Sequence, residues 1–257
     1  MKKSKIAEKS EKIISISKDI EKKTIPQIID CVSSYIEDDK EICLDIKKNR
    51  WFITSFVLCK LNNWYTNDYL ELNDIFYINE SYQGAIVELV STKNNSYKDI
   101  TVLTYDKLFI NIIDNLFDEL EYSNIFFDLK SVFKYVYNYY LNIKNNGGYI
   151  DTCINNWLNY TWGILNNYKI LDIDLSSLII SKVRNTSNLV IKMFNNDIIY
   201  FDTDTIWLKR LPSELIQFNE DNNLRVMEIK SVRNFIIFGK KKYIEIYNDN
   251  FMIRGIR

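Results

Sequence analysis

The stretch that most constrains the fold of this chain is residues 198–208, where two carboxylates stand one residue apart between short β-branched and aromatic runs. The segment reads Ile-Ile-Tyr-Phe-Asp-Thr-Asp-Thr-Ile-Trp-Leu, a pattern that predicts a β-hairpin with a tight turn. Side chains alternate between the two faces of a strand, so we expect Asp202 and Asp204 to lean towards the same side. Paired carboxylates on a rigid hairpin can hold Mg²⁺ for positioning a phosphate, although Asp-Thr-Asp also makes an ordinary polar turn.

Histidine is missing from the 257 residues, and this narrows the chemistry. Without histidine, Ser-His-Asp and Cys-His nucleophile systems and histidine zinc sites are excluded. Three kinds of site stay possible: hard metal ions bound by carboxylates, a reactive lysine, or no catalytic site. The four cysteines form no CxxC pair, so we expect reduced, structural thiols in an intracellular protein.

Charge and hydropathy bear on the partners. The net charge is −1, so the field of the whole chain does not attract nucleic acid, and any DNA contact would depend on local clusters such as the three lysines at 240–242. No apolar run has the length needed to cross a membrane, and residues 1–3 lead into mixed Lys and Glu. We therefore expect no membrane partner and no secretory signal.

Hydrophobic periodicity predicts a helical first part and middle and a β-rich last third. We expect helices at 5–24, 26–37, 51–65, 111–144 and 150–167, and strands at 75–79, 85–91, 100–105, 189–194, 197–201, 205–208, 224–230, 234–238, 242–247 and 251–256. The expected fold class is α+β, with an antiparallel sheet and helices packed on one of its faces.

Four short segments, read in order, resemble the motifs of a known family. Residues 81–85 read Ser-Tyr-Gln-Gly-Ala, and residues 104–106 read Thr-Tyr-Asp at the end of an apolar run. Residues 155–163 read Asn-Asn-Trp-Leu-Asn-Tyr-Thr-Trp-Gly. The fourth segment, Tyr-Phe-Asp-Thr-Asp-Thr at 200–205, is followed by Lys-Lys-Tyr at 241–243 and Ile-Arg-Gly-Ile at 253–256.

These segments are similar to the YxGG/A, DxxSLYPS, KxxxNSxYG and YxDTDS motifs, the KxY element and the KG-containing strand of family B DNA polymerases. The chain resembles in particular the polymerising region of the protein-primed branch found in phages and linear plasmids, truncated and with degenerate motifs. The resemblance covers roughly residues 50–256. It implies an N-terminal helical extension at 1–74 and a palm-like domain at 75–257 with reduced fingers at about 111–170.

The resemblance also implies a catalytic centre. Asp106 and Asp204 would be catalytic residues that bind two Mg²⁺ ions, and Asp202 would be a second or outer ligand. Independently of any family, transfer of a nucleotide needs two divalent cations held by carboxylates that face each other from adjacent strands.

The nucleotide would be bound by Asn155, Asn159 and Gly163, which match the third motif. The reaction also needs a cation to offset charge on the triphosphate, but Asn155 stands where the family has its nucleotide-binding lysine. Lys144 or Lys169 could supply that charge. Asn111 stands where the family has its sugar-checking tyrosine.

DNA would be bound by Tyr82, Gly84, Lys241, Tyr243 and Arg254, which match the YxGG/A, KxY and KG-containing elements. The implied partners are a DNA primer–template and deoxynucleotides, together with a terminal protein or another polymerase chain that supplies a thumb. The composition, rich in Asn, Ile, Lys and Tyr, indicates an AT-rich gene. A linear plasmid, an organellar genome or a virus fits such a gene, with the protein in the mitochondrion or the cytoplasm.

The sequence is therefore compatible with three functions. The first is DNA-directed DNA synthesis by a two-metal mechanism, in the replication of such an element. The second is a catalytically inactive, polymerase-derived subunit that binds DNA or acts as a scaffold, which the loss of the lysine at Asn155 favours. The third is an unrelated structural protein, which would be the case if the hairpin did not lie near Asp106.

Overall fold

The computed structural model describes residues 20–37, 46–64, 87–91, 95–119, 124–165, 169–170 and 173–256. The chain divides into two compact units. The first, here called the helical unit, comprises residues 1–80 and 117–176, and the second, the sheet unit, comprises residues 81–116 and 177–257. Among the described residues, no helix combines the length and the apolar character needed to cross a bilayer.

The helical unit is built from α2 (Ile25–Glu37), α3 (Ile46–Asn62), α5 (Asn124–Asn145) and α6 (Thr152–Ile164), with a short pair of strands, β3 (Lys169–Ile170) and β4 (Ile173–Asp174). Trp51 of α3 stacks on Trp157 of α6 with ring centroids 4.9 Å apart. The Trp51 indole N–H also donates to Thr161 Oγ1 at 2.8 Å. Stacking and the hydrogen bond together fix α3 against α6 inside this unit.

Helix α6 begins two residues after the predicted position 150, and α5 ends one residue after the predicted position 144. The Asp151 side chain accepts the backbone N–H of Cys153 at 2.7 Å, which caps the start of α6. After α5, Gly147 has φ +68° and the Gly148 N–H donates to Ile143 O at 2.9 Å, as at many helix ends that turn through a left-handed glycine.

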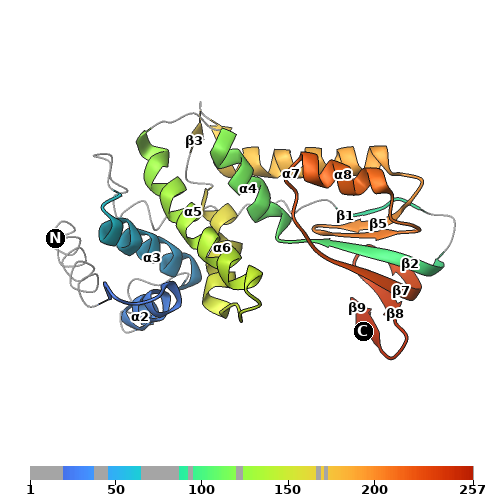
Figure 1. Cartoon of the computed structure of the whole chain (residues 1–257), viewed down its shortest axis with the longest axis horizontal. Helices are drawn as coiled ribbons and strands as arrows, with labels where there is room; N and C mark the ends of the chain where they lie inside the picture. Colours follow the sequence, from blue (N-terminus) through green and yellow to red (C-terminus); the bar gives the residue numbers. More distant parts are fainter. Residues whose placement is uncertain are drawn as a thin grey trace. The chain divides into compact units, whose positions relative to one another are not determined.

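The sheet unit contains a seven-stranded sheet in the order β1-β5-β6-β2-β7-β8-β9, and all of its paired strands are antiparallel. The strands are β1 (Val87–Leu89), β2 (Ser96–Tyr105), β5 (Ile198–Asp202), β6 (Thr205–Leu208), β7 (Val226–Gly239), β8 (Lys242–Ile246) and β9 (Phe251–Arg254). Helices α7 (Leu175–Met193) and α8 (Ser213–Asp221) lie over one face of this sheet, and α4 (Leu108–Glu119) follows β2 (Figure 1). The predicted α+β class with helices on one face is confirmed.

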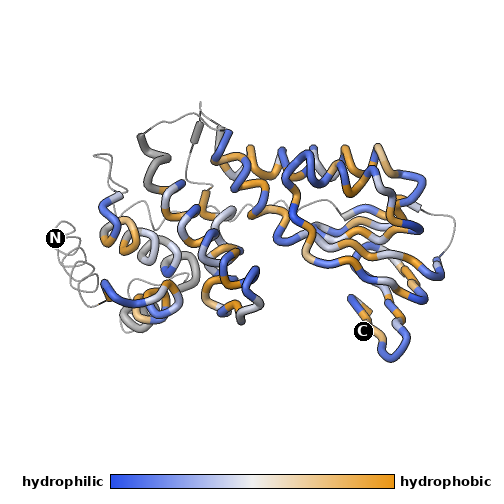
Figure 2. The backbone as a smooth tube through the Cα atoms, viewed as in Figure 1, coloured by the Kyte–Doolittle hydropathy of each residue, from blue (hydrophilic) through white to orange (hydrophobic). Residues whose placement is uncertain are grey.

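The two faces of the sheet carry different cores. The Tyr105 hydroxyl donates to Asn219 of α8 at 2.9 Å, so this side chain of β2 points to the helices. Figure 2 shows hydrophobic and hydrophilic residues following one another along the strands. Because side chains alternate between the two faces, Val102 points to the other face, where it belongs to a second core cluster. There an aromatic cluster forms from Tyr200, Trp207, Phe235 and Tyr243, whose neighbouring ring centroids lie 4.9–6.5 Å apart.

Several boundaries differ from the sequence prediction. The strand predicted at 189–194 is wrong, because these residues are the last turns of α7 and the following bend. The single helix predicted at 111–144 is two helices, α4 and α5. Helices α7 and α8 were not predicted. The predicted strand at 75–79 and most of the predicted helix at 5–24 lie outside the described residues.

The predicted domain boundary at residue 74 also lies outside the described residues and stays a prediction. Helices α5 and α6, which fall in the segment predicted as reduced fingers, pack in the helical unit with α2 and α3.

Candidate functional site

The hairpin predicted at residues 198–208 is confirmed, and its turn is strained. Strands β5 and β6 pair with Asp202 opposite Thr205, which leaves Thr203 and Asp204 as a two-residue turn. Thr203 has φ +59°, a left-handed conformation that is unusual for a β-branched residue. The Asp204 N–H donates to Asp202 O at 2.7 Å, and Thr203 Oγ1 donates to Asp202 Oδ1 at 3.0 Å. Strain of this kind persists only where surrounding contacts hold it, and it is concentrated at functional sites.

Asp106 lies next to this hairpin. Strand β2 pairs with β6, with Thr104 opposite Thr205, and the Tyr105 N–H donates to Asp204 O at 2.7 Å. On the other side of β2, the Asp106 N–H donates to Arg225 O at 2.7 Å. Asp106 is buried, with 4% of its surface exposed. The end of β2 is thus held between the carboxylate hairpin and the start of β7. That the Asp106 and Asp204 carboxylates face each other stays a prediction.

The surroundings of Asp204 disfavour the charged form of its carboxyl group. Burial raises the pKa of Asp204, the Thr205 hydroxyl that donates to it partly opposes this, and the charge of Asp202 adds to the increase. The ammonium group of Lys107 lowers the Asp204 pKa. Sequence reasoning missed Lys107, although its place directly after Asp106 was a usable signal.

Asp106, Asp202 and Asp204 supply carboxylates, the type of ligand that Mg²⁺ uses where it shares its coordination with a substrate, and metal binding by them stays a prediction. Mg²⁺ is commonly bound through one or two carboxylates, with phosphate and water oxygens completing the octahedron. Within the described part of the chain, no three acidic, cysteine or histidine side chains come together as a metal cluster. Asp106, Asp202 and Asp204 are therefore not a ready-made cage of three carboxylates. Besides the Thr203 hydroxyl, the Asp202 carboxylate accepts the Tyr200 hydroxyl, at 3.4 Å.

The segment joining β7 to β8, here called the lysine turn (residues 239–242), lies beside the hairpin. The Lys241 N–H donates to the Tyr200 hydroxyl at 2.8 Å. Tyr243, two residues on, is paired with Arg254 across β8 and β9. Lys241 and Arg254 are exposed, whereas the Tyr243 ring is 5% exposed and packs in the aromatic cluster. The structure thus brings the backbone of Lys241 to the hairpin, and DNA binding by Lys241 and Arg254 stays a prediction. The role of Tyr243 as a DNA contact stays a prediction.

Gly255, the residue directly after β9, lies against the lysine turn, which gives a testable prediction. Its φ is +63°, and a Cβ there would overlap the carbonyl oxygen of Lys241. We expect Gly255→Ala to displace the end of β9 and cost about 1–3 kcal/mol of unfolding free energy, measured by urea denaturation. The matched variant is Gly163→Ala in α6, where a Cβ would meet no atom within 4 Å. It should gain about 0.5–1 kcal/mol, and a similar loss in both variants would contradict this explanation.

The predicted nucleotide-binding residues share one face of α6. Asn155, Asn159 and Gly163 are spaced four apart, so they lie along one side of the helix. None of them is buried, whereas Ile154, Trp157, Leu158, Thr161 and Ile164 form the packed side. This helix belongs to the helical unit, and nucleotide binding by these three residues stays a prediction.

The remaining predicted positions have separate outcomes. Tyr82 and Gly84 lie outside the described residues. Asn111 is buried, and its side-chain carbonyl accepts the Arg225 N–H at 2.9 Å, so it joins α4 to the start of β7. The Lys144 ammonium lies 5.9 Å from the centroid of the Tyr140 ring.

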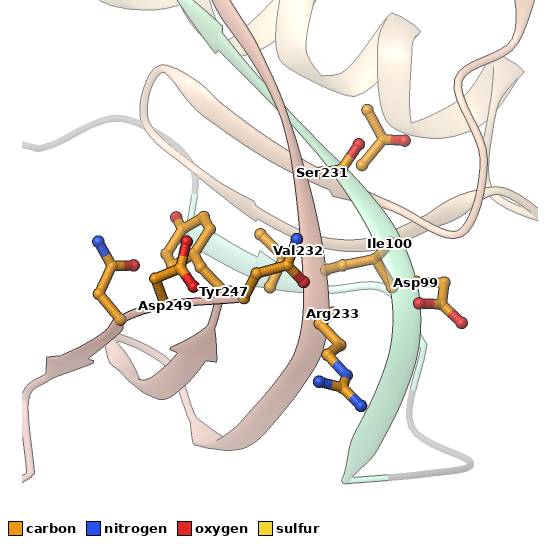
Figure 3. A pocket seen from close by; sticks show the side chains of 10 residues that line it. Asp99, Ile100, Ser231, Val232, Arg233, Tyr247 and Asp249 are labelled. Carbon is orange, nitrogen blue, oxygen red and sulfur yellow. The ribbon is translucent and has the colours of Figure 1, made fainter.

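A polar pocket of about 680 Å³ opens elsewhere on the sheet unit, between β2, β7 and the turn after β8. Figure 3 shows Asp99 and Arg233 along its strands and Tyr247 and Asp249 on the turn side. Asp99 is seven residues before Asp106, roughly 20 Å along an extended strand. The pocket is therefore separate from the carboxylate hairpin.

Comparisons with known proteins relate the fold of this chain to that of DNA polymerases. No protein-family model and no curated protein sequence matches the chain. Among solved structures, a family B DNA polymerase from the hyperthermophilic archaeon Pyrobaculum calidifontis matches with a TM-score of 0.54 and 16% identity, over 89% of this chain and 35% of that one. The Phi29 DNA polymerase in complex with primer-template DNA matches with a TM-score of 0.55 and 11% identity, over 88% and 63% of the two chains.

A second Phi29 DNA polymerase structure, complexed with single-stranded DNA, matches with a TM-score of 0.51 and 12% identity, over 87% of this chain and 62% of that one. The chain thus spans between about a third and just under two thirds of the length of these polymerases. At such low identity the matches establish a shared fold, so the structural neighbours of this chain are family B DNA polymerases.

Proposed function

We propose that this chain is a DNA-directed DNA polymerase that adds deoxynucleotides to a primer with a carboxylate centre at Asp106 and Asp204. The observation that carries the proposal is the hydrogen bond from Tyr105 N–H to Asp204 O. This bond joins the end of β2 to the carboxylate hairpin. The chain that contains this sheet shares its fold with DNA polymerases. The sequence motifs that resemble the protein-primed branch point to the same two residues.

In this proposal Asp106 and Asp204 hold Mg²⁺, and Asp202 orients the hairpin. The chemistry that two bound Mg²⁺ ions supply is stabilisation of charge on the attacking and leaving oxygens of an in-line displacement. The half-buried setting of Asp204 strengthens its attraction to a cation, because nearby water screens it less than at an exposed site. Lys107, whose charge already acts on Asp204, is placed to offset negative charge on a triphosphate in the absence of a lysine at position 155.

The nucleic acid would lie along the exposed cations of the sheet unit. Lys240, Lys241, Lys242 and Arg254 are exposed around the lysine turn, and such groups bind phosphates without reading sequence. The Phi29 DNA polymerase structures contain primer-template and single-stranded DNA, which supports DNA as the partner. A further partner would be a terminal protein or a second polymerase chain. The protein would act in the mitochondrion or the cytoplasm, in the replication of a linear plasmid, an organellar genome or a virus.

The DNA surface gives a second prediction. We expect the double variant Lys241→Gln/Arg254→Gln to bind a primer–template more weakly and to lose about two units from the slope of log affinity against log salt. Fluorescence anisotropy at several salt concentrations measures both quantities. The control is Lys192→Gln, which changes an exposed lysine on α7 away from the lysine turn. It should leave both the affinity and the salt slope unchanged. Equal effects of both variants would remove the lysine turn from the DNA surface.

A catalytically inactive subunit that binds DNA or acts as a scaffold is the second candidate, and Asn155 is the observation that favours it. A neutral amide cannot replace the ammonium group that the resemblance expects on the triphosphate.

Primer extension by purified protein in Mg²⁺ or Mn²⁺ decides between the two candidates. Extension that disappears in an Asp204→Asn protein supports the polymerase. Primer–template binding without any extension supports the inactive subunit.

A further inference from the structure

The hydroxyl group of Tyr200 lies between the carboxylate hairpin and the lysine turn. It accepts the backbone N–H of Lys241 at 2.8 Å, and it lies 3.4 Å from Asp202 Oδ2. A phenol carries one proton and can accept as well as donate. Because the Lys241 amide is the donor in the first contact, the phenol proton is left for the Asp202 carboxylate. One hydroxyl therefore connects a hairpin carboxylate to the backbone of the lysine turn.

The ring that carries this hydroxyl is rigid. Tyr200 is fully buried, and its ring packs 4.9 Å from Trp207 and 5.9 Å from Tyr243, measured between centroids. Burial raises the pKa of Tyr200 to about 12, so the hydroxyl keeps its proton at physiological pH. The geometry of the connection is thus set by packing in the aromatic cluster.

The lysine turn needs external support. Gly239 pairs with Lys242, so Lys240 and Lys241 form a two-residue loop that is followed directly by a third lysine. Lys241 has φ +60°, the left-handed region that residues with a Cβ avoid. Its N–H is held by Tyr200, and its carbonyl packs against Gly255. These contacts oppose the backbone strain.

We propose that the Tyr200 hydroxyl is a positioning group that sets the orientation of the lysine turn relative to the carboxylate hairpin. In that orientation the lysines hold the phosphates of a nucleic-acid strand next to the hairpin. The hydroxyl itself touches no substrate and acts through the backbone of Lys241. The identity of the ligand as a nucleic-acid strand rests on the proposed function.

Tyr200→Phe tests the proposal, because it keeps the ring and removes only the hydroxyl. The matched control is Tyr97→Phe, whose ring packs against the core cluster that contains these aromatic residues, while its hydroxyl donates to Ser91 Oγ at 3.0 Å. Amide hydrogen exchange of Lys241, followed by NMR without metal or DNA, reports the state of the turn. Anisotropy titration with a primer–template reports nucleic-acid binding.

In Tyr200→Phe we expect the Lys241 amide to exchange about tenfold faster and the primer–template affinity to fall by about three- to tenfold. Both quantities should stay at the wild-type value in Tyr97→Phe. Unchanged exchange at Lys241, or equal changes in the two variants, overturns the proposal. Faster exchange with unchanged affinity also overturns it, because the hydroxyl would then hold the lysine turn without affecting nucleic-acid binding.

The exchange measurement needs neither catalysis nor DNA, so it is independent of the proposed function. Wild-type protein that binds a primer–template but does not extend it overturns the polymerase assignment and leaves the role of Tyr200 standing. Wild-type protein that binds no primer–template overturns the role of Tyr200 in holding nucleic acid.

Discussion

Replacement of Asp204 by Asn is expected to reduce metal-dependent primer extension by about 10³-fold or more, while the protein stays folded. The change removes the charge of a residue proposed to hold Mg²⁺, and loss of one electrostatic contact at a catalytic centre typically has an effect of this size. Single-turnover extension of a labelled primer in Mg²⁺ measures the loss. Asp249→Asn, an exposed change elsewhere on the sheet unit, is the matched control and should extend normally. Undiminished extension by Asp204→Asn would contradict the proposed centre.

The same variant should be more stable than the wild type in metal-free buffer at neutral pH. The pKa of Asp204 is raised in the folded state, so the folded protein binds this proton more tightly than the unfolded chain does. Stability associated with the protonated group is therefore present at low pH and is lost as pH rises through the folded pKa. Asn avoids that loss, so the melting-temperature difference between variant and wild type should shrink as pH falls towards the ordinary pKa of aspartate. A difference that grows at low pH would contradict the assignment.

Removal of the Glu245 side chain is expected to cause the largest loss of stability. This carboxylate is 1% exposed on β8 and accepts hydrogen bonds from the Trp207 indole N–H and the Tyr247 hydroxyl. Glu245→Ala leaves both donors without their acceptor beside the aromatic cluster and opens a cavity there. We expect a cost of about 3–5 kcal/mol in unfolding free energy, measured by urea denaturation followed by tryptophan fluorescence.

Two further variants isolate the cause of that loss. Glu245→Gln keeps one acceptor oxygen for two donors, so its cost should lie between those of the wild type and the alanine variant. Glu214→Ala on α8 removes an exposed carboxylate and should change stability by no more than about 0.5 kcal/mol. If Glu245→Ala costs no more than Glu214→Ala, the buried hydrogen bonds do not support the sheet.

Elements with strong local signals were predictable. The hairpin at 198–208 follows from period-2 alternation around a short polar turn, and both of its strands lie within eleven residues. Helix α6 follows from its apolar spacing and from Asp151 at its start. The segment 189–194 was mispredicted because a short apolar, β-branched run fits a strand as well as a helix. Its membership of α7 depends on the turns that precede it.

The sequence by itself determined the carboxylate hairpin, the helical middle and the β-rich last third, because these depend on neighbours within a few residues. Only the tertiary structure decided that β2 lies between β6 and β7, and hence that Asp106 lies beside a hairpin 98 residues later. It also decided that Lys107 acts on Asp204, and that Tyr200 and Glu245 join β5 and β6 to the β7–β9 part of the sheet. The physical reason is that pairing between distant strands depends on how the whole chain buries its apolar faces and satisfies its buried polar groups.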